Sequence, residues 1–202
     1  SVRSVARKAN MRRKVLESSV LFISILKWLF LATVAGVLVG LSTTVFLKAL
    51  GFSISAASGY QYYYLLLPLA LFLSALVVKY LAPDAEGHGT EKIIEAVHKH
   101  SGKVRLMVVP VKLVATIITI AFGGSAGKEG PAAQIGAGVS SAFSDLLRFD
   151  SKDRKKLVIC GISAGFATVF GTPIAGAIFG VEVLFVGGML YEVLLPSFVA
   201  GI

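Results

Sequence analysis

The chain has 202 residues, of which 55% are hydrophobic and only 15% are charged. Soluble globular domains average about 45–50% apolar and about 25% charged residues. This composition therefore excludes an ordinary soluble domain, and it also excludes a disordered chain, which requires low hydrophobicity and high charge. At ~20 residues per membrane-spanning helix, the length predicts an all-α polytopic membrane protein with about five to eight helical segments.

The N-terminal segment is strongly basic. Residues 1–14 contain six cationic side chains and no acidic one, in a chain whose formal net charge is +9. Ahead of a long apolar stretch, this pattern predicts a cytoplasmic amphipathic helix over residues 1–17 that lies on the inner membrane surface, and a transmembrane domain over residues 18–202. A nucleic-acid-binding arm has a similar composition but does not normally precede a membrane span, so we expect no nucleic-acid partner.

Two apolar stretches predict the first membrane spans. Residues 21–47 are almost wholly apolar apart from Lys27, and a second apolar stretch covers residues 64–78. Between them, residues 49–64 carry no charge and end in four tyrosines, a composition typical of the boundary between bilayer and water. We therefore expect this tyrosine-rich loop to lie on the outer side of the membrane.

A polar segment and a third apolar run follow the second span. The polar segment predicts a short helix over residues 90–99 that ends before Gly102. The third run covers residues 104–122, and its length favours a helix over a strand.

The distribution of cationic residues constrains the topology. They concentrate at residues 1–27, 92–105 and 148–156, and the positive-inside rule places these clusters and the N-terminus in the cytoplasm. The glycine-dense turn at residues 123–130 lies between two of these clusters, so we expect it to be re-entrant. The expected helical pieces after this turn are short and cover residues 131–143, 157–170, 173–186 and 189–202.

A helix that begins inside the bilayer near Lys128 presents unpaired amide groups and the positive end of its dipole. Pro131 suits the first turn of such a helix, and the neighbouring glycines leave the backbone accessible. Amides and a helix dipole can bind an anion without a full cation, which would trap the ion and stop conduction. The sequence therefore predicts an anion pathway at this helix start.

Glu129 lies at this helix start, and two interpretations of it remain open. A carboxylate can simply stabilise a helix N-terminus. Alternatively, Glu129 competes with the anion for the same site and gates the pathway, because ionisable residues inside a membrane are functional candidates by default. We favour the gate.

Two motifs that would indicate an enzyme or a metalloprotein fail on inspection. The phosphate-binding loop of nucleotide hydrolases requires a glycine at position 122 and a serine or threonine at position 129, which are Phe122 and Glu129 here. Glu95 and His98 match half of a di-iron motif, but the partner copy is missing. We therefore expect no enzymatic activity, no cofactor and no metal site.

Three motifs in order resemble the CLC family of chloride channels and proton-coupled chloride transporters, and the resemblance covers the whole chain. Residues 127–131 read GKEGP and match the family's GREGP signature with lysine in place of arginine. Residues 171–182 resemble the next family motif, and residues 87–89 lie where the family has GSGIP. The resemblance implies a pore built from helix N-termini that meet near mid-membrane, with tilted and re-entrant half-helices, and chloride as the transported ion.

The resemblance also assigns residue roles. It implies that Glu129 is the gating glutamate. It implies anion binding by Gly87, His88, Gly89, Lys128, Glu129 and Gly130, and structural roles in the pore motifs for Gly127, Pro131, Gly171, Pro173 and Glu182.

Departures from the family pattern change what the resemblance implies. His88 replaces the serine that usually contacts the central chloride, so it is either a polar helix cap or a pore residue that gains a charge near pH ~6.5. Val183 replaces the glutamate that serves as inner proton relay in exchangers, which favours a channel. Pro131 resembles the chloride-type members rather than the fluoride exporters.

The family's fold consists of two inverted repeats, and this chain resembles the first repeat only. We therefore expect it to require the second half for conduction, to contact membrane lipid, and to form a homodimer through residues 171–202 in the cell membrane. A proton-coupled chloride antiporter and a non-transporting membrane interaction module remain the alternatives to a chloride channel.

Overall fold

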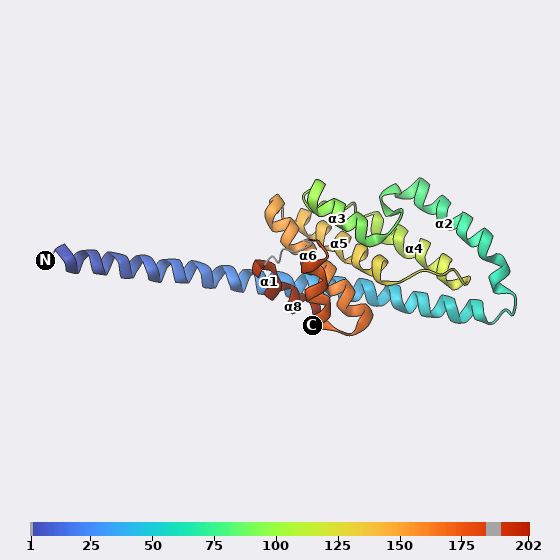
Figure 1. The fold of residues 1–202 in the computed structure, drawn as a ribbon, viewed down its shortest axis with the longest axis horizontal. Helices are drawn as coiled ribbons and strands as arrows, with labels where there is room; N and C mark the ends of the chain where they lie inside the picture. The colour runs from blue at the N-terminus through green and yellow to red at the C-terminus, as the bar shows by residue number, and fades with distance from the viewer. Residues whose placement is uncertain (1, 185–190) are drawn as a thin grey trace.

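The computed structural model describes residues 2–184 and 191–202, except for the side chains of residues 2–18 and residue 20. The described residues form helices joined by turns and loops and contain no β-strand, which confirms the predicted all-α class (Figure 1). In chain order the elements are α1 (Val2–Ser58), η1 (Tyr63–Leu66), α2 (Leu67–Leu81), η2 (Pro83–Ala85), α3 (Gly89–Lys99), α4 (Val108–Ala121), α5 (Glu129–Leu146), α6 (Ser151–Phe170), α7 (Pro173–Glu182) and α8 (Tyr191–Gly201).

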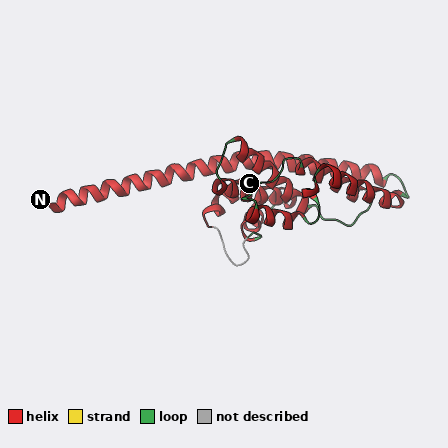
Figure 2. Ribbon diagram, turned by 90° about the horizontal axis from the view of Figure 1, so that it is seen from above, coloured by secondary structure: helices red, strands yellow, loops and turns green. Residues whose placement is uncertain are grey.

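Helix α1 is the longest element, and it extends far beyond the helical bundle at its N-terminal end (Figures 1 and 2). At ~1.5 Å per residue its 57 residues reach about 86 Å. The predicted loop at residues 49–64 is wrong in its first part, because α1 continues to Ser58. That segment contains only one helix-disfavouring residue, Gly51, so an established helix propagates through it. The backbone of residues 2–17 continues into α1, and its position on the membrane surface stays a prediction.

The second span is confirmed, and the third apolar run forms a shorter helix than predicted. Residues Tyr63–Leu81 form an apolar helical stretch of 19 residues, long enough to cross a membrane. Helix α4 begins at Val108 rather than at residue 104. A start at Val108 places Pro110 in the first turn, where its missing N–H costs nothing, whereas an earlier start would place it in the helix interior.

Helices α5 and α6 form the centre of the bundle, and both are longer than predicted. Helix α5 has 18 residues, so at ~1.5 Å per residue it reaches about 27 Å rather than stopping well short of the bilayer thickness. Helix α6 includes the polar segment before residue 157 because Asp150 caps it, accepting a hydrogen bond from the Asp153 amide at 2.8 Å. The two helices cross at glycines: a methyl group on Gly136 would collide with the carbonyl oxygen of Gly161.

Helices α7 and α8 pack against α6 on the other side of the bundle. A methyl group on Gly176 or Gly180 would collide with Ser163 or Ala167 of α6. A methyl group on Gly36 of α1 would similarly collide with the backbone of α8. Helix α7 ends at Glu182, before the predicted boundary, and residues 185–190 lie outside the described part of the chain.

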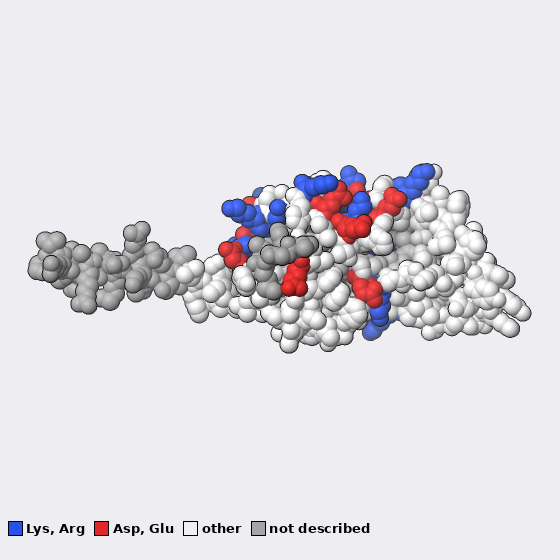
Figure 3. Space-filling model, in the orientation of Figure 1, with Lys and Arg blue, Asp and Glu red and all other residues white. Residues whose placement is uncertain are grey.

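The charged side chains are unevenly distributed. In Figure 3 most of them gather along the edge formed by α3 and the adjacent ends of α5 and α6, whereas α2, apart from Lys79 in its last turn, and the C-terminal end of α1 present an uncharged surface. The apolar stretches Leu21–Ser58 and Tyr63–Leu81 are largely exposed in the bundle. Such large exposed apolar surfaces are typical of contact with lipid or with further protein.

Candidate anion-binding site

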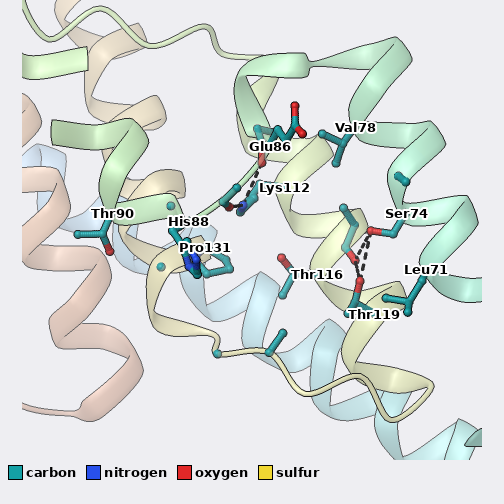
Figure 4. Close-up of a pocket in the computed structure, with 18 of the residues that line it drawn as sticks. Leu71, Ser74, Val78, Glu86, His88, Thr90, Lys112, Thr116, Thr119 and Pro131 are labelled. Carbon is teal, nitrogen blue, oxygen red and sulfur yellow. Dashed lines mark hydrogen bonds between the residues drawn. The ribbon is translucent and has the colours of Figure 1, made fainter. Parts of the chain in front are cut away.

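Two of the predicted motifs meet at one cavity (Figure 4). The cavity has a volume of about 1050 Å³ and is lined by α2, residues 83–90, α4 and residues 125–131. A methyl group on Gly89 would collide with the carbonyl group of Gly130. The N-termini of α3 and α5 are therefore in direct contact, and only glycine at position 89 permits this approach.

Most of the predicted anion-binding residues line this cavity. They are Gly87, His88, Gly89, Glu129 and Gly130, and the predicted structural residues Gly127 and Pro131 join them. Lys128 is the exception: within the described chain it stands at the N-cap of α5 without lining the cavity. Residues separated by about forty positions in the sequence are thus brought together by the packing of α3 on α5.

The start of α5 has the features of an anion site. No side chain of the described residues caps this helix, so its first amide groups have no partner inside the helix. The carboxylate of Glu129 folds back over the turn, because a methyl group on Gly127 would collide with Glu129 Oε2. Glu129 therefore places a negative group beside the unpaired amides, as both interpretations of this residue require.

The start of α3, like that of α5, has no side-chain cap among the described residues. His88 is the N-cap residue of α3, but within the described part of the chain its side chain makes no capping hydrogen bond. The exposed imidazole lines the cavity instead, which argues against the interpretation of His88 as a helix cap. Gly87 before it has a φ of +76°, a conformation that strongly favours glycine.

Lys112 of α4 is the functional candidate that sequence reasoning missed. Its Nζ donates hydrogen bonds of 2.9 Å to the carbonyl oxygens of Ala85 and Gly87, and only 8% of the residue is exposed (Figure 4). The available signal in the sequence is an ionisable side chain inside the apolar run at residues 104–122. The side chain of Lys112 lies in the cavity wall, and the expectation that the anion is bound without a full cation stays a prediction.

Lys112 contacts the backbone of the segment that precedes α3. Among the described residues, no carboxylate lies within 4.0 Å of its Nζ. Its two bonds hold the Gly87 segment in place just before the first turn of α3. The lining of the cavity also contains Lys79, Glu86 and Glu129, so both signs of charge are present in its wall.

The wall opposite the helix N-termini carries hydroxyl groups. Thr119 Oγ1 donates to Ser74 Oγ at 3.2 Å, and Ser74 Oγ donates to the Ala115 carbonyl at 3.2 Å, so a polar contact joins α2 to α4 (Figure 4). Thr116 and Ser125 also line the cavity. Hydroxyl groups on this wall can form hydrogen bonds with a hydrated ion that moves along the cavity.

The residues of the third predicted motif lie elsewhere. Gly171 ends α6 with a φ of +67°, and Pro173 is the first residue of α7, so both shape the turn between these helices. Val183 is half-buried and packs against the main hydrophobic core. In the described structure, neither this turn nor Glu182 lines the cavity.

The other motifs weighed in the sequence have ordinary surroundings. Glu95 forms ion pairs with Lys92 and Lys99 at 3.6 and 3.5 Å along the surface of α3. His98 Nδ1 lies 2.9 Å from the Ile94 carbonyl oxygen. The described residues contain no cluster of three or more His, Cys, Asp or Glu side chains that could hold a metal ion.

Comparisons with known proteins agree with this geometry. Residues 69–202 match the family model for the voltage gated chloride channel. The chain belongs to the voltage gated chloride channel (CLC) family. It is therefore part of a membrane protein of the CLC fold.

The names of related proteins indicate several transport functions. The chain is 38% identical over 178 residues to a chloride/fluoride channel protein of Pseudomonas syringae pv. tomato, covering 88% of this chain and 39% of that protein. It is 34% identical over 167 residues to the H(+)/Cl(-) exchange transporter ClcA of Salmonella schwarzengrund, covering 76% of this chain and 35% of that one. Both relatives are transport proteins for halide ions by name.

Solved structures show the same fold. A CLC-type fluoride/proton antiporter superposes with a TM-score of 0.80 at 30% identity, covering 89% of this chain and 45% of that one. A eukaryotic CLC transporter superposes with a TM-score of 0.73 at 19% identity, covering 89% and 37%, and this match shows the fold alone. The chain thus spans less than half the length of these relatives.

Proposed function

We propose that this chain forms one half of a halide pathway in which the N-termini of α3 and α5 bind the ion. The observation that carries the proposal is the contact of Gly89 with Gly130 at a cavity lined by both motifs. Each helix N-terminus is equivalent to roughly half a positive charge. Two such termini in contact, with Lys112 nearby, create a positive site for a small anion.

Chloride is the ion we propose first, in line with the family. Backbone amides at Lys128, Glu129 and Gly130 bind it on the side of α5, and Gly87, His88 and Gly89 bind it on the side of α3. Fluoride is the second candidate, because two of the compared proteins carry fluoride in their names. His88, which lines the cavity with a ring in place of a small hydroxyl, is the residue we propose to set the preference between the halides.

Glu129 serves as the gate in this proposal. Its carboxyl group lies over Gly127, next to the amides that would otherwise bind the halide. Protonation removes the charge that competes with the halide, and displacement of the side chain vacates the site.

We further propose a channel-like mechanism rather than proton exchange. The side chain at the position of the inner proton relay is Val183, which cannot transfer a proton and packs in the core. The competing mechanism, proton-coupled antiport, is supported by the names of the Salmonella relative and of the superposed antiporter. Uphill proton movement driven by a chloride gradient would decide for antiport.

The rest of the assembly belongs to the proposal as well. Because the chain spans less than half of its relatives, we propose that the second inverted repeat completes the pathway. Helices α7 and α8 keep Ile174, Ile178 and Leu195 exposed, and we propose this face for a homodimer. A non-transporting interaction module would use the same face without conducting ions.

Flux through liposomes tests the proposed function. The purified full polypeptide is reconstituted, and chloride and fluoride efflux are followed with ion-selective electrodes. Glu129→Gln, which removes the competing charge at nearly constant shape, is expected to change the halide flux and to reduce its dependence on pH.

Glu91→Gln is the matched control, because Glu91 is exposed on α3 and lies outside the cavity; it is expected to leave the flux unchanged. If neither the unaltered protein nor Glu129→Gln releases either halide, the chain is not part of a halide pathway.

A further inference from the structure

A second cavity lies on the other side of α3 and has no role in the proposed halide pathway. Its volume is about 520 Å³, and it is enclosed by α3, residues 100–105, the start of α4 and Gln134 of α5. Among the described residues, none lines both cavities. The amide of Val104 donates a 2.9 Å hydrogen bond to Ser141 Oγ of α5, so the connection that forms one wall is fixed to the bundle.

The walls of this cavity are predominantly cationic. Four basic side chains line it, against two acidic ones. Both acids already have cationic partners, since Asp84 pairs with Arg105 at 3.5 Å and Glu95 pairs with two lysines. Lys103 has no carboxylate within 4.0 Å among the described residues. The basic residues are Lys92, His100, Lys103 and Arg105.

The titration of Glu95 reports the sign of the local field. Lys99, and after it Lys92, hold the pKa of the Glu95 carboxyl below its ordinary value, and His100 adds a smaller effect in the same direction. Cations that depress the pKa of a carboxyl create a positive potential around it. Lys92 and His100, which contribute to this shift, line the cavity, whereas Lys99 lies outside its lining.

Gln134, one of the residues that line the cavity, carries a buried acceptor that is unpaired within the described chain. Gln134 is only 3% exposed, and its Nε2 donates to the Asp84 carbonyl at 3.2 Å. This bond orients the amide, and its Oε1 has no partner among the described residues. Leaving a buried acceptor without a donor is costly, so a ligand hydroxyl or a water molecule that donates to Oε1 would be favoured.

We propose that this cavity binds a phosphate group that carries a neighbouring hydroxyl, as in a polyol lipid headgroup or a nucleotide. The volume far exceeds that of a halide, and a cluster of lysine and arginine suits the doubly charged, multi-oxygen surface of a phosphate. The hydroxyl donates to Gln134 Oε1. The cationic residues at 92–105 are predicted to face the cytoplasm, so a lipid headgroup and a nucleotide would both reach the cavity from that side.

Occupancy of this cavity would affect the halide site through residues 84–89. Asp84 is held by Gln134 through its carbonyl and by Arg105 through its carboxylate. The next residues, Ala85 and Gly87, are held by Lys112. A phosphate that draws Arg105 away from Asp84 releases one of the contacts that position the first turn of α3, and thereby regulates conduction.

Binding measurements test the site independently of transport. The purified full polypeptide is placed in phosphatidylcholine nanodiscs with or without phosphatidylglycerol, and ATP is titrated separately in solution at constant ionic strength. We expect one of the two probes to bind, and the probe that binds identifies the source. The double variant Lys103→Gln/Arg105→Gln is expected to weaken that binding about tenfold or more, because it removes two charge-assisted contacts.

Two further variants serve as controls for this binding measurement. Lys152→Gln, which removes one positive charge from an exposed residue of α6 outside the cavity, is expected to leave the affinity unchanged. Lys103→Arg/Arg105→Lys is expected to retain it. Absence of binding by both probes, or equal affinity of the double variant and the unaltered protein, overturns the site. Binding without a change in halide flux overturns its regulatory role while leaving the proposed halide pathway intact.

Discussion

At the scale of single residues, the candidate site depends on positions where only one side chain fits. Gly89 has no space for a methyl group beside Gly130. Lys112 reaches two carbonyl oxygens that would otherwise be unpaired in the cavity wall. Neither role can be inferred from local sequence, because each depends on an element that lies more than twenty residues away.

Lys112→Met provides a test at this scale. Methionine fills a similar volume but donates no hydrogen bond, so it leaves the Ala85 and Gly87 carbonyls without their donor. An unsatisfied buried acceptor costs about 1–3 kcal/mol, and we expect a lower thermal midpoint in detergent together with reduced halide flux.

Lys79→Met is the matched control, because Lys79 lines the same cavity from an exposed position. It is expected to preserve the thermal midpoint. Equal midpoints and fluxes for the two variants would contradict the positioning role of Lys112.

At the scale of elements, the existence of most helices could be predicted, whereas their ends were predicted less well. Helix α3 was predicted almost to the residue, because Gly102 with a φ of +77° terminates it locally. Helix α6 begins earlier than predicted because the Asp150 cap outweighs the polar composition of the residues that follow it. A helix start that depends on a local cap can be predicted from the capping residue. The apolar pattern alone places such a start too far along the chain.

The crossing of α5 and α6 makes a prediction at this scale. Gly161→Ala inserts a methyl group against the Gly136 carbonyl and Ser140, and overpacking of this kind costs about 1–3 kcal/mol. We therefore expect a clearly lower thermal midpoint, measured by the loss of a monodisperse peak after heating in detergent.

Gly51→Ala is the opposite case in α1, because no atom lies within 4 Å of the added methyl group. Alanine is preferred over glycine inside a helix by roughly 0.5–1 kcal/mol, so this variant is expected to be neutral or slightly more stable. A destabilised Gly51→Ala protein together with an unaffected Gly161→Ala protein would contradict this packing.

At the scale of the whole molecule, charge and apolar surface are separated. The charged edge formed by α3 and the adjacent ends of α5 and α6 contrasts with the surface of α2 and the end of α1, which is uncharged apart from Lys79 (Figure 3). The stretch Leu21–Ser58 has 38 residues, about 57 Å at ~1.5 Å per residue. This exceeds the ~30 Å hydrocarbon core, so α1 must tilt or project from the bilayer.

Cysteine labelling tests the predicted topology. Cys160, the only cysteine of the chain, is buried, so it gives little background with a membrane-impermeant maleimide. Gln61→Cys in the tyrosine-rich loop is expected to react in intact cells. Lys99→Cys at the end of α3 is expected to react only after the cells are opened. The reverse pattern would invert the assignment of the N-terminus to the cytoplasm.

The sequence by itself determined the class of the protein, its family and the position of its motifs, because hydrophobicity, helix signals and short motifs are properties of neighbouring residues. It predicted correctly that a helix begins near Lys128 after a glycine-rich turn, although the helix starts two residues before the predicted piece at residues 131–143. Only the tertiary structure decided that this helix start touches Gly89, that Lys112 braces the adjoining segment, and that a second, cationic cavity lies beneath α3. These features arise where distant helices pack together, and the contact depends on side-chain volumes and hydrogen-bond partners from several elements at once.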